Sequence, residues 1–218
     1  LEHMKPALKV LFSGVKKILF IPYARPSGMS YDAYTDIAAK GLGFLGVEVQ
    51  GIHTFKDVSE AVKNAEAIFT GGGNTFMLLK TLYENNLVEA LQKAVAGGTP
   101  YMGSSAGSNI TGLTIRTTND MPIVYPPSFD ALQLVPFNIN PHYLDPDPNS
   151  KHQGETRETR IKEFHFANSQ PVIGLREASW LRREGGQLLL KGPHKGRLFE
   201  KGKEPREVEQ GDVSFLLS

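Results

Sequence analysis

The chain of 218 residues has no cysteine at all. Disulfide bonds, thiolate metal sites and cysteine nucleophiles are therefore excluded. It also lacks any apolar run near the roughly 18–20 residues that a membrane-spanning helix needs, and its amino end does not resemble a secretory signal. We therefore expect a soluble cytoplasmic protein without a membrane partner.

An excess of charge of either sign is missing as well. The 24 lysines and arginines nearly balance the 23 acidic residues, which gives a net charge of +1, and basic residues run no longer than a dipeptide such as Lys16-Lys17. No electrostatic field therefore selects nucleic acid as a partner. The length, without repeats or a linker, predicts a single domain over residues 1–218 with room for a hydrophobic core.

The first hundred residues alternate strand-like and helix-like segments. Apolar runs predict strands at 17–23, 47–52, 67–70 and 99–102, with helical patterns before and between them. Such alternation favours parallel pairing with right-handed crossovers. In sheets of this kind, ligands bind at the carboxyl ends of the strands.

The second half of the chain differs from the first in its proline content and in its pattern of apolar residues. Between Thr117 and Ser150, frequent prolines exclude a long helix and predict ordered loops around short strands. Residues 154–166 are again typical of a helix. From Val172 onward, short apolar runs broken by glycines predict a β-meander.

The stretch Gly103-Ser104-Ser105-Ala106-Gly107 follows one of the expected strands and leads into a helix-like segment. G-x-S-x-G in that context is a nucleophile elbow, in which the glycines permit a tight turn that lifts the serine to the end of the strand. The short motif also occurs in ordinary loops, so the other parts of a hydrolase must support it. Ser105 is the candidate nucleophile.

Serine needs a general base within hydrogen-bond reach. His142 follows Asn138-Ile139-Asn140-Pro141, an apolar strand that ends in a rigid turn, and we predict that its imidazole lies at a strand end as the serine does. His152 is the reserve candidate. The remaining histidines occupy positions typical of structural or solvent-facing residues, namely His3, His53, His165 and His194.

An acid must in turn orient the imidazole and stabilise the imidazolium. Glu177 ends the expected strand at 172–176, so it is a polar residue at a strand end. Asp120 is the competing candidate. Both carboxylates remain candidates for the acid at this point.

The turn Gly71-Gly72-Gly73-Asn74 follows another expected strand. We expect the Gly73 N–H, together with the Ala106 N–H beside the nucleophile, to stabilise an oxyanion. The alternative reading is a phosphate cradle ahead of a helix, but the turn lacks both the G-K-[ST] ending and the G-x-G-x-x-G spacing.

Metal catalysis has little support in the sequence. There is no H-E-x-x-H motif, and the cluster of His142, Asp145 and Asp147 is interrupted by prolines. We therefore expect neither a metal nor a cofactor.

Taken together, these features resemble the aspartyl dipeptidases of serine peptidase family S51, over nearly the whole chain and most weakly after about Lys191. The run Thr117–Val124 and the run Gly71–Phe76 are far more specific than the elbow. The similar segments are Phe20–Ala24, Gly71–Phe76, Gly103–Gly107, Ile115–Val124, Asn138–His142 and Gly154–Arg157.

The resemblance implies a three-layer α/β sandwich with a mostly parallel central sheet, like class I glutamine amidotransferases, and a small β-rich C-terminal region. Members of the family carry a strand before the helix that begins this chain, so we expect the first strand of the family fold to be absent here. An elbow of Gly-Ser-Ser rather than Gly-Trp-Ser is a local difference from the family pattern.

The activity that the resemblance implies is hydrolysis of dipeptides with an amino-terminal aspartate, through an acyl-enzyme and without a metal. Ser105 would be the nucleophile, His142 the base and Glu177 the acid, with Asp120 as second choice. Two other readings stay open: a cyanophycinase-like β-aspartyl peptidase, and a non-catalytic module that binds aspartyl peptides. A homodimer also stays open.

Selection of aspartate requires a cation, ideally a bidentate guanidinium. Arg157 is the first candidate and Arg116 the second. Asp120 is the candidate partner for the α-ammonium group of the substrate, and Asn74, beside the glycine-rich turn, belongs to the same expected binding set.

Overall fold

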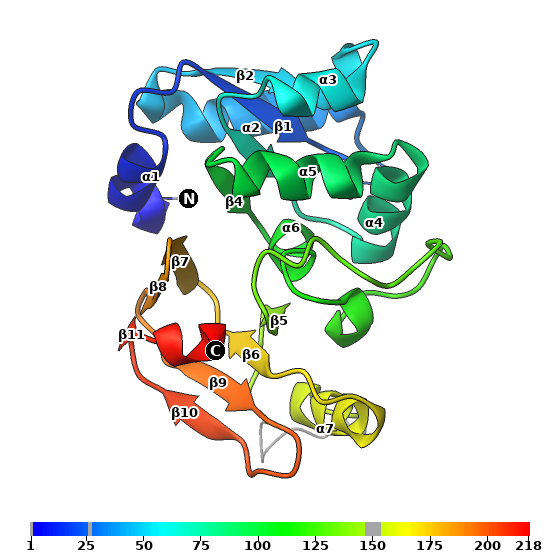
Figure 1. Ribbon diagram of the computed structural model, residues 1–218, viewed down its shortest axis with the longest axis vertical. Coiled ribbons are helices and arrows are strands. Elements are labelled where there is room, and N and C mark those ends of the chain that lie inside the picture. Colours follow the sequence, from blue (N-terminus) through cyan, green and yellow to red (C-terminus); the bar gives the residue numbers. More distant parts are fainter. Residues whose placement is uncertain (1, 26–27, 147–153) are drawn as a thin grey trace.

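The computed structural model describes residues 2–25, 28–146 and 154–218. Its first half contains a four-stranded parallel sheet. The strands, in spatial order, are β2 (Glu48–Gly51), β1 (Lys17–Ile21), β3 (Ile68–Thr70) and β4 (Tyr101–Gly103). Each lies where the sequence predicts a strand, within two residues at either end. This sheet forms the upper part of the molecule in Figure 1.

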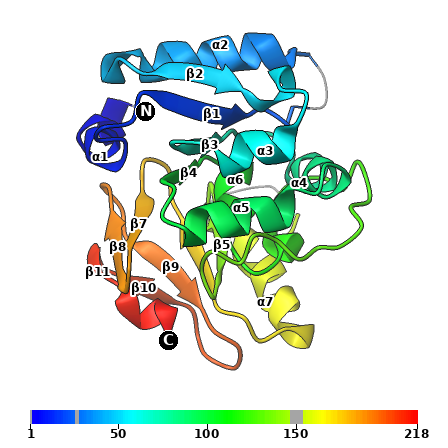
Figure 2. The same ribbon diagram turned by 45° about the horizontal axis from the view of Figure 1, so that its top comes forward.

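Helices cover both faces of the parallel sheet (Figure 2). Side chains of β1 alternate between the faces: Ile18 and Phe20 pack with one helical layer, whereas Leu19 and Ile21 pack with the other. The first layer contains α1 (Lys5–Leu11), which follows a short 3₁₀ turn at Glu2–Met4, and α2 (Tyr31–Leu42). The second layer contains α3 (Val58–Lys63), α4 (Thr75–Glu84) and α5 (Leu87–Ala96).

Polar side chains fix where several helices begin. Ser30 accepts a hydrogen bond from the Ala33 N–H at the start of α2 (3.1 Å), and Asn74 accepts one from the Met77 N–H at the start of α4 (3.0 Å). These caps satisfy N–H groups that have no partner inside the helix. The cap at Asn74 therefore sets the position of α4 directly after the glycine-rich turn.

The second half of the chain forms two further sheets, seen in the lower part of Figure 1. The larger has the order β10-β9-β6-β5, and the smaller has the order β11-β8-β7. Their strands are β5 (Asn138–Pro141), β6 (Val172–Leu175), β7 (Trp180–Glu184), β8 (Gln187–Lys191), β9 (Gly196–Phe199), β10 (Arg206–Val208) and β11 (Gly211–Asp212). The helices are α6 (Ala106–Asn109), which follows the elbow, and α7 (Arg157–Ala167). Short 3₁₀ turns lie at Gly43–Leu45, Ile52–Thr54, Ile115–Thr117 and Ser214–Leu217.

The α/β class with a parallel sheet and a β-rich C-terminal region is confirmed. The expected simple meander from Val172 onward is wrong, because β6 pairs with β5 and β9 rather than with β7. The backbone at Ala178, between β6 and β7, adopts φ 62°, and the hairpin of β7 and β8 that follows belongs with β11 to a separate sheet. Strand β5 also lies in a different sheet from β4.

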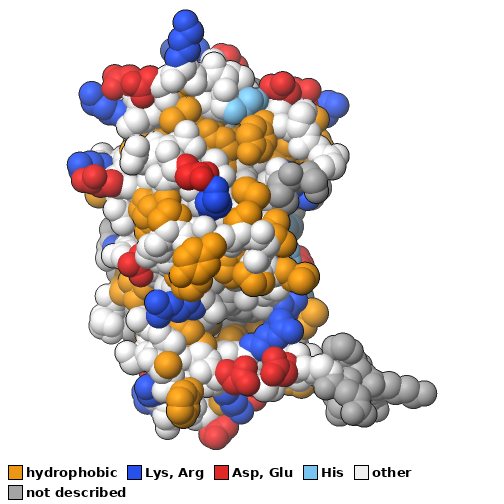
Figure 3. Space-filling view, turned by 90° about the vertical axis from the view of Figure 1, so that its right-hand side faces the viewer, with side chains coloured by type: hydrophobic (Ala, Val, Ile, Leu, Met, Phe, Trp, Pro, Cys, Tyr) orange, Lys and Arg blue, Asp and Glu red, His pale blue; other side chains and the backbone are white. Residues whose placement is uncertain are grey.

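One face of the molecule carries a band of hydrophobic side chains across its middle (Figure 3). Large exposed apolar residues of the long loop before β5 include Met121, Ile123 and Tyr125. Among the residues that the structure describes, none of the helices combines the length and apolar character that spanning a bilayer requires.

Candidate active site

Ser105 lies in the tight turn between β4 and α6, with backbone angles φ 54° and ψ −113°. Positive φ is strained for a residue with a side chain and is typical of a nucleophile elbow. The flanking glycines have no room for a side chain. A β-carbon on Gly103 would fall 2.2 Å from the carbonyl oxygen of Gly107, and one on Gly107 would fall 2.2 Å from the carbonyl oxygen of Thr70. The elbow therefore needs both glycines.

His142 directly follows β5 and also has positive φ, at 56°. Its Nδ1 is hydrogen-bonded to a carboxylate oxygen of Glu177, so the two residues that follow neighbouring parallel strands meet at one sheet end. The Tyr143 N–H donates to the carbonyl oxygen of Leu175 (2.9 Å). This bond joins the backbone next to His142 to the backbone near Glu177. In the described residues Nε2, the other ring nitrogen, has no hydrogen-bond partner.

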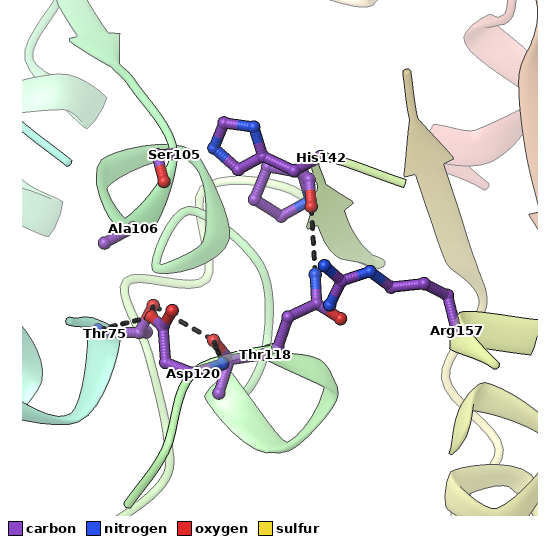
Figure 4. A pocket seen from close by; sticks show the side chains of 9 residues that line it. Thr75, Ser105, Ala106, Thr118, Asp120, His142 and Arg157 are labelled. Atoms are coloured by element: carbon purple, nitrogen blue, oxygen red, sulfur yellow. Dashed lines mark hydrogen bonds between the residues drawn. The ribbon is translucent and has the colours of Figure 1, made fainter. Parts of the chain in front are cut away.

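Ser105 and His142 line one pocket of about 210 Å³. Figure 4 shows the imidazole facing the serine across this space. Within the described residues no hydrogen bond joins the two side chains; such catalytic contacts are often long in unliganded enzymes and shorten when substrate binds. The complete lining consists of Thr75, Ser105, Ala106, Thr118, Asn119, Asp120, Pro141, His142 and Arg157.

Asp120 is held at the start of α4. One of its oxygens accepts hydrogen bonds from the Thr75 backbone N–H (2.7 Å) and from the Thr75 hydroxyl (2.6 Å). The positive end of the helix dipole stabilises a carboxylate there. Asp120 thus lies in the pocket with a carboxylate bound to Thr75, whereas Glu177 is the carboxylate on His142.

Arg157 is the first residue of α7, and its guanidinium reaches into the pocket (Figure 4). Within the described part of the chain, this guanidinium has no hydrogen bond or ion pair. Burial lowers the pKa of Arg157, the nearby Arg160 lowers it further, and Asp120 raises it. An unpaired, partly desolvated cation at a pocket wall is suited to binding an anionic group.

The two backbone N–H groups expected to bind an oxyanion are free of other acceptors in the described residues. Ala106 is the first residue of α6, so its N–H has no partner inside the helix. At the glycine-rich turn, two backbone N–H groups have acceptors. Gly71 donates to Ile21 (3.1 Å), and Asn74 donates to Ala24 (2.7 Å). Within the described residues, the N–H groups of Gly72 and Gly73 have no backbone acceptor, and Gly73 is the one expected to bind the oxyanion.

Two residues of the expected binding set do not line the pocket. Arg116 donates to the side chain of Asn168 (3.2 Å) and lies over the ring of Phe129. The side chain of Asn74 caps α4 and donates to the carbonyl oxygen of Met121 (2.9 Å). His152 and Asp147 lie outside the described residues.

Three lining residues were not singled out from the sequence: Thr75, Thr118 and Asn119. The side chain of Asn119 donates to the carbonyl oxygen of Pro141 (3.1 Å) and accepts from Asn140 (3.0 Å). It thereby fixes the segment carrying Asp120 to the end of β5. All three belong to the two most specific sequence runs, Gly71–Phe76 and Thr117–Val124, so membership of these runs is the sequence feature that could have identified them.

Comparisons with known proteins show which family the chain belongs to. The model of Peptidase family S51 matches residues 1–191. The chain is 50% identical over 218 residues to the peptidase E of Streptomyces coelicolor, covering 100% of this chain and 88% of that protein. It is 47% identical over 221 residues to the probable alpha-aspartyl dipeptidase of Drosophila melanogaster, covering 100% of this chain and 91% of that protein.

A solved structure of a putative peptidase E protein from Listeria monocytogenes EGD-e has the same fold. Its TM-score is 0.69 at 24% identity, over 88% of this chain and 94% of that one. The structure of a peptidase from an acI-B1 actinobacterium gives a TM-score of 0.72 at 19% identity, over 96% and 91% of the two chains. The chain described here belongs to peptidase family S51.

Proposed function

We propose that this protein is a serine dipeptidase that hydrolyses the peptide bond after an amino-terminal aspartate. One observation carries the proposal: a single pocket holds Ser105, the imidazole that contacts Glu177, and the guanidinium of Arg157, which has no ion pair among the described residues. The names of the relatives, peptidase E and probable alpha-aspartyl dipeptidase, support the same activity.

In the first step, the hydroxyl oxygen of Ser105 attacks the carbonyl carbon of the aspartyl residue while Nε2 of His142 takes the hydroxyl proton. Glu177 accepts the hydrogen bond from Nδ1 and stabilises the imidazolium that forms. The N–H groups of Gly73 and Ala106 receive the negative charge on the carbonyl oxygen. One such donor is typically worth about 2.7–4 kcal/mol in the transition state.

In the second step, the carbon–nitrogen bond breaks and the imidazolium returns the proton to the leaving amine. The carboxyl-terminal amino acid departs, and the aspartyl group remains as an ester on Ser105. A water molecule then attacks the ester carbonyl while His142 takes one of its protons. Collapse of that intermediate releases aspartate and restores the serine hydroxyl.

The charges of the pocket match the aspartyl residue. Because both residues line the pocket, we assign the guanidinium of Arg157 to the side-chain carboxylate of the substrate and the carboxylate of Asp120 to its α-ammonium. Asparagine would leave the arginine facing a neutral amide. Once a bound substrate covers the guanidinium, leaving that charge without its partner costs about 2 kcal/mol or more, which corresponds to roughly thirtyfold or more in kcat/KM.

The test is product analysis by chromatography on Asp-Leu, Asn-Leu, β-Asp-Leu and N-acetyl-Asp-Leu. We expect rapid release of leucine from Asp-Leu only, and no release by the Ser105→Ala variant. Preference for β-Asp-Leu would support a β-aspartyl peptidase instead. Comparable turnover of Asp-Leu and Asn-Leu would show that Arg157 does not select the side chain.

A further inference from the structure

Arg176 stands between the end of β6 and Glu177, and its guanidinium makes five hydrogen bonds. Nε and Nη2 donate to the two oxygens of Asp145 (2.8 and 2.6 Å). Nη1 and Nη2 donate to the two oxygens of Glu207 (2.9 and 2.9 Å), and Nη1 also donates to the carbonyl oxygen of Lys195 (2.7 Å). Because a guanidinium has five N–H donors, all are satisfied.

The contact between Arg176 and Asp145 lies beside the contact between His142 and Glu177. Asp145 is three residues after His142, and Arg176 is one residue before Glu177. The same two chain segments are therefore joined twice by side chains, once through the imidazole and once through the guanidinium. His142 and Glu177 are themselves 51% and 70% exposed, so packing alone does not hold them.

Glu207 anchors this pair of segments to the rest of the sheet. It lies on β10 and also pairs with Arg197 on β9 (3.3 Å). Arg197 in turn pairs with Glu158 (3.3 Å), the residue next to Arg157 on α7. β6, β9, β10 and α7 lie together in the lower part of Figure 1. One connected set of ion pairs thus reaches from Asp145, three residues after His142, through Arg176, Glu207 and Arg197 to Glu158 on the helix that carries the substrate-binding cation.

We infer that Arg176 is a positioning residue of the active site. Through Asp145 and Glu207 it holds the segment after His142 against the turn that carries Glu177, so that the imidazole keeps its orientation towards Ser105. The inference rests on the proposed function, because it assigns Arg176 a part in activating that serine.

The geometry requires arginine rather than any cation. A lysine ammonium is a point charge that cannot meet two carboxylates with paired, planar hydrogen bonds. Arg176 is only 17% exposed, whereas Asp145 is 56% exposed. The guanidinium is therefore the fixed member, and the loop that carries Asp145 is the member that it restrains.

The test measures how fast a fluorophosphonate labels Ser105, because this reaction needs an activated serine but no aspartyl substrate. The main variant is Asp145→Asn/Arg176→Gln, which removes one charge of each sign and so leaves the net charge unchanged. We expect labelling to slow between roughly tenfold and a hundredfold, since a displacement of about 1 Å costs about that much in rate. For Asp-Leu, we expect kcat to fall by the same factor with KM within twofold.

Arg176→Lys is expected to behave like the double variant, because charge without the planar fork does not restore the orientation. Arg182→Gln is the matched control: it removes an exposed pair with Glu184 on β7 that touches neither segment. That variant should keep wild-type labelling. If the double variant does not fold, Asp145→Asn alone tests the same contact.

Labelling of the double variant within twofold of wild type, at a temperature where circular dichroism shows it folded, overturns the inference. The proposed substrate can fail separately: a wild-type enzyme that is labelled but does not cleave Asp-Leu still allows the comparison of labelling rates. A wild-type enzyme that is not labelled at Ser105 overturns both proposals.

Discussion

Gly72 lies directly against Ser105: a β-carbon on the glycine would fall 2.8 Å from Cβ and 3.4 Å from Oγ of the serine. The two residues follow different strands of the parallel sheet, β3 and β4, which pair with each other. The turn that contains Gly73 and the turn that carries Ser105, the proposed nucleophile, are thus in contact. Any side chain between them would displace one or the other.

We predict that Gly72→Ala lowers kcat for Asp-Leu by roughly a hundredfold. The added methyl group must push the serine, and a displacement of about 1 Å can cost that much. The matched control is Gly43→Ala, where a β-carbon would meet nothing within 4 Å and φ is −54°. That variant should keep full activity. Equal kcat for Gly72→Ala and wild type would show that the turn moves instead of the serine.

A second prediction concerns stability. Gly103→Ala should lower the free energy of unfolding by about 1–3 kcal/mol or more, because its β-carbon meets a backbone oxygen that cannot rotate away. Gly43→Ala should be neutral or stabilising by about 0.4–1 kcal/mol, through the unfolded chain. Urea unfolding of both variants measures the difference. An unchanged midpoint for Gly103→Ala would mean that the elbow adapts.

Much of the parallel half was predictable because its signals are local. Apolar runs predicted β1 and β3. Ile18 and Leu19 point to opposite faces of the sheet because successive side chains of any strand do so. The elbow at Ser105 was predictable for the same reason, since five consecutive residues define it. The strand before His142 was also predicted, although its place in a second sheet was not.

The remaining parts depend on chain segments that meet only after folding. Thr75 lines the pocket because Asp120, far along the chain, binds the start of its helix. In the sequence, nothing distinguishes Arg176 from the other dispersed lysines and arginines. Its inferred positioning role depends on its contacts with Asp145 and Glu207, each 31 residues away. No periodicity or spacing reports such ion pairs, because surface-like charges give the same pattern whether paired or not.

A third prediction separates the two carboxylates. Asp120→Asn removes the charge expected to bind the α-ammonium, so KM for Asp-Leu should rise about tenfold or more while fluorophosphonate labelling of Ser105 stays within twofold. Glu177→Gln should slow labelling and lower kcat with little change in KM, since the amide cannot stabilise the imidazolium. Stability should fall by no more than about 1 kcal/mol in Asp120→Asn, the usual value of a charge at a helix start. The reverse pattern of labelling would make Asp120 the acid on His142.

The last prediction uses the pH dependence of stability. Hydrogen bonding from Arg176 lowers the pKa of Asp145 and that of Glu207 in the folded protein. The unfolded values are about 3.9 and 4.3. A carboxyl whose folded pKa lies below its unfolded pKa contributes stability above the unfolded value and loses it as the pH falls through the folded value.

Wild type should therefore lose this contribution on acidification from about pH 5 to about pH 2, whereas Arg176→Gln has little of it to lose. Thermal unfolding across that range should show the two melting temperatures well separated at neutral pH and converging in acid. Arg182→Gln, which leaves both carboxyls with their cation, should follow the wild-type curve. A gap between wild type and Arg176→Gln that stays constant with pH would contradict the prediction, because it would mean that the arginine stabilises the fold by packing its side chain rather than by binding the two ionised carboxylates.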